Sequence, residues 1–136
     1  MYMLDTNICI YLMKGKYPAL QEKILSLRPD DICISAITVY ELEYGAAKSR
    51  WGSSTRQKMR IFLAPFNIVP YEDKDSEAAG TIRAYLERHG RPIGAYDILI
   101  AAQGLSRGLT VITHNTQEFE RIPSLKIQDW TFPVSN

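Results

Sequence analysis

The sequence predicts an α/β fold in which an open parallel sheet of about five strands carries helices on both faces. Short apolar runs rich in Ile, Val and Tyr recur along the chain, and amphipathic helical patterns separate them. The runs do not alternate between apolar and polar residues, as is typical of parallel strands covered on both faces. Strands that alternate with helices indicate right-handed crossovers. Because 136 residues fit one ordinary domain, we expect a single domain over residues 1–136.

The elements follow one another in a regular order. The expected strands are five short runs at residues 1–4, 32–35, 67–70, 110–113 and 126–130. Helical patterns fill the intervals at about 7–14, 18–28, 36–49, 54–65, 75–89 and 95–107. In the segment 75–89, apolar residues repeat three and four positions apart, opposite a charged face. Gly90, Pro92 and Gly94 then end this pattern before the next helix begins.

Composition and charge exclude several classes of protein. Sixteen basic and fifteen acidic residues leave a net charge of +1, which excludes a polycationic nucleic-acid coat but not an enzyme with a local binding patch. The apolar runs are shorter than the ~20 residues that a membrane span needs, and Asp5 interrupts the first one, so we expect no signal peptide and no membrane contact. Cys9 and Cys33 lack zinc-site spacing, which favours buried thiols in a reduced, cytoplasmic protein.

Four separate segments bring acidic side chains, or an amide beside one, toward the carboxyl ends of the predicted strands. Asp5 follows the first strand, and Glu41 stands about two helical turns after the second. Asp97 lies in the first turn of the helix that precedes the fourth strand, and Asn115 and Glu118 follow that strand. Because open parallel sheets bind ligands at the carboxyl ends of their strands, we expect these side chains at one edge of the sheet.

Each acid also has a structural interpretation. Asp5 fits a helix N-cap, Thr38 and Glu41 fit the capping-box spacing, and Asp97 fits the positive end of a helix dipole. A cluster is harder to explain in this way, because neighbouring carboxylates repel one another unless a cation lies between them. Mg²⁺ or Mn²⁺ prefers such oxygen ligands and supports phosphoryl chemistry by neutralising a phosphate and activating water.

Four segments extend over nearly the whole chain: "LDTNICIYL", "ISAITVYELEYGA", "GRPIGAYDILIAA" and "LTVITHNTQEFERI". In order and spacing they resemble the four motifs of the PIN-domain ribonucleases, and in particular those of the VapC toxins of bacterial toxin–antitoxin pairs. The resemblance implies a PIN-like α/β/α sandwich. It also implies that Asp5, Glu41 and Asp97 are catalytic and hold one or two Mg²⁺ or Mn²⁺ ions.

The resemblance assigns roles to the remaining polar residues of the motifs. Thr6 and Asn7 match the small polar pair that supports the metal ligands by hydrogen bonds. Asn115 stands where the wider family often has an Asp, so the fourth acidic position is a departure from the family pattern. We expect that position to be filled in one of two ways. Asn115 would bind the metal through its carbonyl, or Glu118, one helical turn later, would serve as a catalytic metal ligand. This departure leaves the presence of a second metal ion open.

The function that the resemblance implies is that of a toxin, a Mg²⁺-dependent endoribonuclease that leaves 5′-phosphate and 3′-hydroxyl ends. The branch that carries "GRPIG" and "THNTQEFERI" implies a transfer RNA substrate, with initiator tRNA cut in the anticodon stem-loop as the most specific expectation. The family also implies a homodimer and a VapB-like antitoxin whose tail inserts an Arg into the acidic pocket.

Two other functions remain as alternatives. The chain fits a catalytically weak PIN-like module that acts mainly by binding its antitoxin, which the neutral Asn115 favours and the three acids disfavour. A receiver-like phospho-switch is disfavoured, because only one acid follows the first strand and the "THNTQEF" loop has no Lys. His114 fits either a general base or an ordinary loop residue.

Two basic groups fit an RNA-binding face; a solvated charged face explains the first equally well, and a partner-protein groove is the alternative for the second. The first consists of Arg83, Arg88, His89 and Arg91, with Lys14 and Lys16 elsewhere in the chain; the second consists of Lys48, Arg50, Trp51, Arg56, Lys58 and Arg60.

Overall fold

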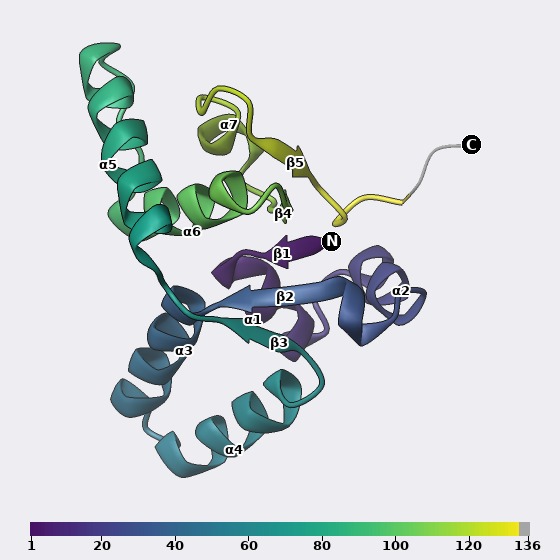
Figure 1. The fold of residues 1–136 in the computed structure, drawn as a ribbon. Helices are drawn as coiled ribbons and strands as arrows, with labels where there is room; N and C mark the ends of the chain where they lie inside the picture. Colours follow the sequence, from purple (N-terminus) through teal and green to yellow (C-terminus); the bar gives the residue numbers. More distant parts are fainter. Residues whose placement is uncertain (134–136) are drawn as a thin grey trace.

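A computed structural model describes residues 1–133 and shows a five-stranded parallel sheet between two layers of helices (Figure 1). The strands are β1 (Tyr2–Leu4), β2 (Ile32–Ser35), β3 (Asn67–Val69), β4 (Thr110–Ile112) and β5 (Lys126–Gln128). They lie in the order β3-β2-β1-β4-β5, and every neighbouring pair is parallel. The predicted α/β fold class and all five predicted strands are confirmed, with each end within two residues of its expected place.

Helices connect the strands and cover both faces of the sheet (Figure 1). They are α1 (Thr6–Lys14), α2 (Pro18–Leu25), α3 (Ala36–Lys48), α4 (Gly52–Leu63), α5 (Asp73–Arg88), α6 (Ala95–Ser106) and α7 (Thr116–Phe119), with a 3₁₀ turn at Pro29–Asp31. The six helices expected from the sequence are present. The short α7 and the 3₁₀ turn were not predicted, because a single turn contains too few residues to show a helical period.

Side chains that alternate along the short strands divide the core into two faces. Leu4, Ile34 and Ile112 belong to a cluster that also includes residues of α1, α2 and α4. The adjacent strand residues Met3 and Val111 are buried against the helices that cover the other face, chiefly α6 for Met3 and α5 to α7 for Val111. The middle strands are therefore buried on both sides, which explains their continuous apolar sequence.

The two cysteines are both free and buried. Cys9 packs in the cluster under α1, and Cys33 packs against the helices on the opposite face of the sheet. Burial raises the pKa of both thiols, and that of Cys33 to about 11. The prediction of buried thiols is confirmed. Within residues 1–133, none of the helices combines the length and the apolar character that crossing a membrane requires.

The strand order reverses at β1, which lies between β2 and β4. Leu4 pairs with Ile34 on one side and with Ile112 on the other. The backbone N–H of Asp5 then donates to the carbonyl of Ile112 at 3.0 Å, so the chain after β1 is fixed to the end of β4. The carboxyl ends of β1, β2 and β4 therefore meet at one edge, where an open parallel sheet places its ligand site.

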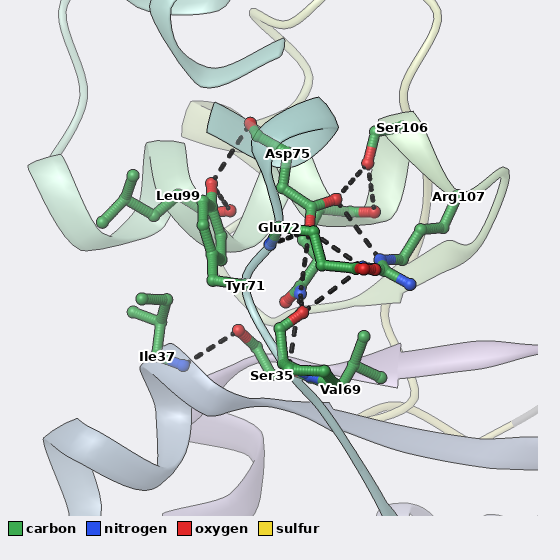
Figure 2. A network of polar contacts seen from close by, with 11 residues as sticks. Ser35, Ile37, Val69, Tyr71, Glu72, Asp75, Leu99, Ser106 and Arg107 are labelled. Atoms are coloured by element: carbon green, nitrogen blue, oxygen red, sulfur yellow. Dashed lines mark hydrogen bonds and ion pairs between the residues drawn. The ribbon is translucent and has the colours of Figure 1, made fainter. Parts of the chain in front are cut away.

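A buried polar network fixes α5 to α6, and Figure 2 shows its contacts. The carboxylate of Asp75 is fully buried and lies 2.9 Å from Nη2 of Arg107, and it also accepts from the hydroxyl of Ser106. Burial alone would raise the pKa of Asp75, but the hydrogen bonds from Arg107, Ser106 and the amide of Glu72 hold it below its usual value. The network lies at the C-terminal end of α6, and so fixes the helix whose first turn contains Asp97.

Candidate active site at the carboxyl edge of the sheet

Asp5 lies where β1 meets α1 and is only 3% exposed. Its Oδ1 accepts a hydrogen bond from the amide of Ile8 at 2.9 Å, so Asp5 caps α1, as its structural interpretation predicts. Burial nevertheless raises the pKa of Asp5 to about 6, although the Thr113 hydroxyl and the Ile8 amide oppose this change. The charges of Asp97 and Glu41 raise it further, which indicates that these acids lie near one another.

Glu41 lies in the middle of α3 and does not cap it. The N-cap of α3 is Ser35, whose hydroxyl accepts from the amide of Ile37 at 3.0 Å. The capping-box interpretation of Thr38 and Glu41 is therefore wrong. The hydroxyl of Thr6 instead donates to Oε1 of Glu41 at 2.7 Å, and it lies 3.1 Å from the hydroxyl of Thr38. Thr6 thus connects the start of α1 to the carboxylate on α3.

Asp97 is the third residue of α6 and is half-buried. Burial raises the pKa of Asp97 to about 6, and the charges of Glu118 and Glu41 raise it further. The positive end of a helix dipole would act in the opposite direction, because it favours the charged form of a carboxyl group. Asp97 does lie in the first turn of α6, as its structural interpretation predicts, and burial and the neighbouring carboxylates raise its pKa there.

Asn115 and Glu118 lie together after β4, at the start of α7. Asn115 is the N-cap residue of α7, and its Nδ2 donates to Oε2 of Glu118 at 2.8 Å. Its backbone amide donates to the hydroxyl of Thr113 at 2.9 Å. The side-chain amide of Asn115 thus orients the carboxylate of Glu118, and the charge of that carboxylate raises the pKa of Asp97.

Two residues of the sequence motifs are not drawn into the acidic group. Asn7 is exposed, and its side chain makes no hydrogen bond within the described part of the chain. Nδ1 of His114 lies 3.0 Å from Oδ2 of Asp129 and 3.0 Å from the hydroxyl of Thr131. The His114 ring also packs against Tyr17, with ring centres 5.6 Å apart. These contacts favour the ordinary loop interpretation of His114 over that of a general base.

The predicted basic groups do not neutralise the acids. Arg83 forms an ion pair with Glu87 at 3.2 Å, and Arg56 forms one with Glu43 at 3.1 Å. The charges that act most strongly on Asp5 are those of other carboxylates, and the same holds for Asp97. The edge of the sheet therefore has an uncompensated negative charge.

The donor set at this edge consists of oxygen atoms alone. It contains the carboxylates of Asp5, Glu41, Asp97 and Glu118, and the carbonyl of Asn115. Within residues 1–133, no three His, Cys, Asp or Glu side chains lie close enough together to enclose an ion as they stand. Carboxylates that act on one another in this way repel, and a divalent cation would relieve the repulsion. A hard cation such as Mg²⁺ fits these donors, whereas a zinc site would favour nitrogen or sulfur.

The family described as "PIN domain" matches residues 2–125, which include the whole sheet edge and all four sequence motifs. The chain belongs to the PIN-domain family. The motif resemblance predicted from the sequence is thereby confirmed, together with the α/β/α arrangement that it implied.

Relatives with known names place the chain in the VapC group of that family. It is 42% identical over 129 residues to the tRNA(fMet)-specific endonuclease VapC of Salmonella typhimurium, and the match covers 95% of this chain and 97% of that protein. It is 40% identical over 130 residues to the protein of the same name from Shigella flexneri, with 96% and 98% covered. The structure of DNA-bound VapBC from Salmonella typhimurium contains a chain that superposes with a TM-score of 0.90 at 41% identity, with 95% of this chain and 97% of that chain covered.

Proposed function

We propose that the chain is the toxin of a type II toxin–antitoxin system and acts as a Mg²⁺-dependent endoribonuclease that hydrolyses RNA phosphodiester bonds. The observation that supports this proposal is that Asp5, Glu41 and Asp97 act on one another through their charges at the carboxyl edge of a PIN fold, with Glu118 acting on Asp97. The names of the relatives from Salmonella typhimurium and Shigella flexneri support tRNA as the substrate class, and initiator tRNA as its first member to test.

Asp5, Glu41 and Asp97 would hold the Mg²⁺ ion, or Mn²⁺ in its place, with Glu118 as the fourth carboxylate. Bound there, the ion would neutralise charge on the scissile phosphate and lower the pKa of water to make it a nucleophile. The hydrogen bond from Thr6 holds Glu41 in place, as that from Asn115 holds Glu118. Asn115 is therefore assigned a supporting role.

The pKa values of Asp5 and Asp97 fit this role. Both are raised to about 6 by burial, so both carboxyls are mostly ionised at pH 7.5 and able to bind a cation. Their charges are concentrated where the cation would relieve the repulsion. Asp5 is also fixed by its cap of α1, so one ligand is preorganised before the ion arrives.

The proposal extends to partners in the cytoplasm. The similarity to a chain of a VapBC complex supports a VapB-like antitoxin as the binding partner. We propose that the tail of the antitoxin places an Arg among the carboxylates, where a guanidinium would offset the same negative charge that a metal offsets. A homodimer is part of the same proposal. The neutral Asn115 favours one second candidate, a module that acts mainly by binding its antitoxin.

The proposal is tested by incubating the purified, antitoxin-free chain with a mixture of tRNAs in Mg²⁺ or EDTA and mapping the new RNA ends. We expect cleavage in Mg²⁺ only, with 5′-phosphate and 3′-hydroxyl products. A folded chain that cuts none of the tRNAs, nor other structured RNAs, contradicts the nuclease proposal and favours the binding module.

A further inference from the structure

Two exposed tyrosines flank the acidic edge. Tyr40 directly precedes Glu41 on α3, and Tyr96 directly precedes Asp97 on α6. The two residues are 51% and 45% exposed, and their ring centres lie 5.4 Å apart with the ring planes inclined at 59°. Their hydroxyls lie 3.1 Å apart, although 56 residues separate the two along the chain. The same two helices therefore bring both carboxylates and a paired aromatic surface to one place.

Tyr44 and Lys48 continue this surface along α3. Tyr40, Tyr44 and Lys48 are spaced by four residues, so they share one helix face, with about 6 Å of rise from each to the next. Tyr44 is 57% exposed, and Nζ of Lys48 lies 4.9 Å from the centre of its ring. We call these four residues, Tyr40, Tyr44, Lys48 and Tyr96, the tyrosine strip. It begins at the acidic edge and ends at a cation.

The chemistry of the strip differs from that of its surroundings in a way that suits nucleic acid. Carboxylates repel an approaching phosphate, so binding energy near them must come from groups without negative charge. Exposed aromatic rings supply it by stacking on unpaired bases, and a lysine at the far end supplies a partner for a backbone phosphate. The polar hydroxyl ends also suit rings that stay in water, unlike the apolar side chains of a core.

We propose that the tyrosine strip binds an unpaired RNA segment next to the scissile bond, with bases stacked on Tyr40, Tyr44 and Tyr96 and a phosphate on Lys48. This inference rests on the proposed ribonuclease function. Because bases within a duplex do not expose their faces, the strip selects single-stranded segments such as loops over paired stems. Because every base can stack on an aromatic ring, the strip selects its substrate by conformation and not by base sequence.

The experiment measures binding of two short single-stranded probes to the full chain carrying Asp97→Asn, which prevents cleavage. One probe is oligouridylate, and the other is an abasic ribose-phosphate strand of equal length. We expect Tyr44→Ala to weaken oligouridylate binding by about 5- to 150-fold, the range for loss of one stacked base, and to leave the abasic strand unaffected. Tyr44→Phe keeps the ring and should bind within about twofold of the parent. Phe132→Ala, at an exposed aromatic outside the strip, is the matched control.

Three results would overturn the proposal. They are equal binding of both probes by the parent chain, normal oligouridylate binding by Tyr44→Ala, and an equal loss of affinity for both probes in Tyr44→Ala. Light scattering identifies the cause of the last result, because a simultaneous change in oligomeric state assigns the strip to a protein interface. Cleavage assays keep the two proposals apart. If the wild type cleaves RNA but the strip variants bind oligouridylate normally, only the role of the tyrosine strip is contradicted. If the chain binds oligouridylate through its bases but cleaves no RNA, only the nuclease proposal is contradicted.

Discussion

The substitution Asp5→Asn should stabilise the metal-free protein at neutral pH, although it removes a proposed metal ligand. Asn is as good an N-cap as Asp, so the hydrogen bond from Ile8 to the cap is kept. The substitution removes a buried negative charge that faces Asp97 and Glu41. We therefore expect Asp5→Asn to raise the stability of the metal-free protein and to weaken its binding of metal.

The magnitude follows from the pKa. Burial raises the pKa of Asp5 from 3.8 to about 6, and a difference of about two pH units corresponds to ~3 kcal/mol of unfolding free energy. Because the folded state binds the proton more tightly, the unfolding free energy falls as pH rises from about 4 to about 6. Below this range Asp5 is protonated in both states, so its burial has no such cost.

The assay is urea unfolding in EDTA at pH 4 and pH 7.5. We expect Asp5→Asn to be about 2–3 kcal/mol more stable than the wild type at pH 7.5 and nearly equal at pH 4. Adding Mg²⁺ at pH 7.5 should stabilise the wild type and leave the variant unchanged. Asp30→Asn, at an exposed position, serves as the control for loss of a surface carboxylate. A variant less stable than the wild type at both pH values would refute the reasoning.

Three further substitutions test separate parts of the structure. Thr6→Val removes the 2.7 Å hydrogen bond to Glu41 and should lower the rate of RNA cleavage about tenfold. Thr6→Ser keeps the hydroxyl and should cleave at the wild-type rate. Equal rates for Thr6→Val and the wild type would show that Thr6 does not support the site. Asn115→Asp places a second carboxylate beside Glu118, so isothermal titration should show Mg²⁺ binding as tight as in the wild type or tighter, and abolished binding in a folded variant would contradict its placement. Asp75→Ala removes the buried carboxylate partner of Arg107, which keeps only its more exposed ion pair with Glu72 at 2.7 Å, and should cost about 3 kcal/mol in urea unfolding, with a cost below about 1 kcal/mol arguing against the network.

The fold was predictable because its signals are local. The continuous apolar character of the strands follows from their burial on both faces, and this shows in the sequence without any knowledge of pairing. The order of the strands was not predicted, because it depends on which crossovers pass over which face. The turn that forms α7 escaped prediction since four residues, Thr116–Phe119, carry no period.

The acidic site was predictable as a set of positions but not as a set of contacts. The end of the first strand places Asp5 at the carboxyl edge of the sheet, and the start of the helix before the fourth strand places Asp97 at the same edge. The sequence left Glu41 with two interpretations, and only the position of Ser35 at the start of α3 removed the capping one. Asp75 was not singled out, because its burial and its bond to Arg107 depend on how α5 packs on α6. No local pattern encodes such a contact.

Metal-dependent cleavage by the carboxylates is tested by the rate of RNA cleavage by the wild type and by Asp97→Asn, each measured in Mg²⁺ and in EDTA. Both proteins are purified free of antitoxin, and circular dichroism confirms that the variant is folded. We expect cleavage by the wild type in Mg²⁺, none in EDTA, and none by the variant in either condition. Cleavage by Asp97→Asn at the wild-type rate, in preparations shown to be free of contaminating nuclease, would contradict the assignment of the carboxylates to a metal-dependent active site.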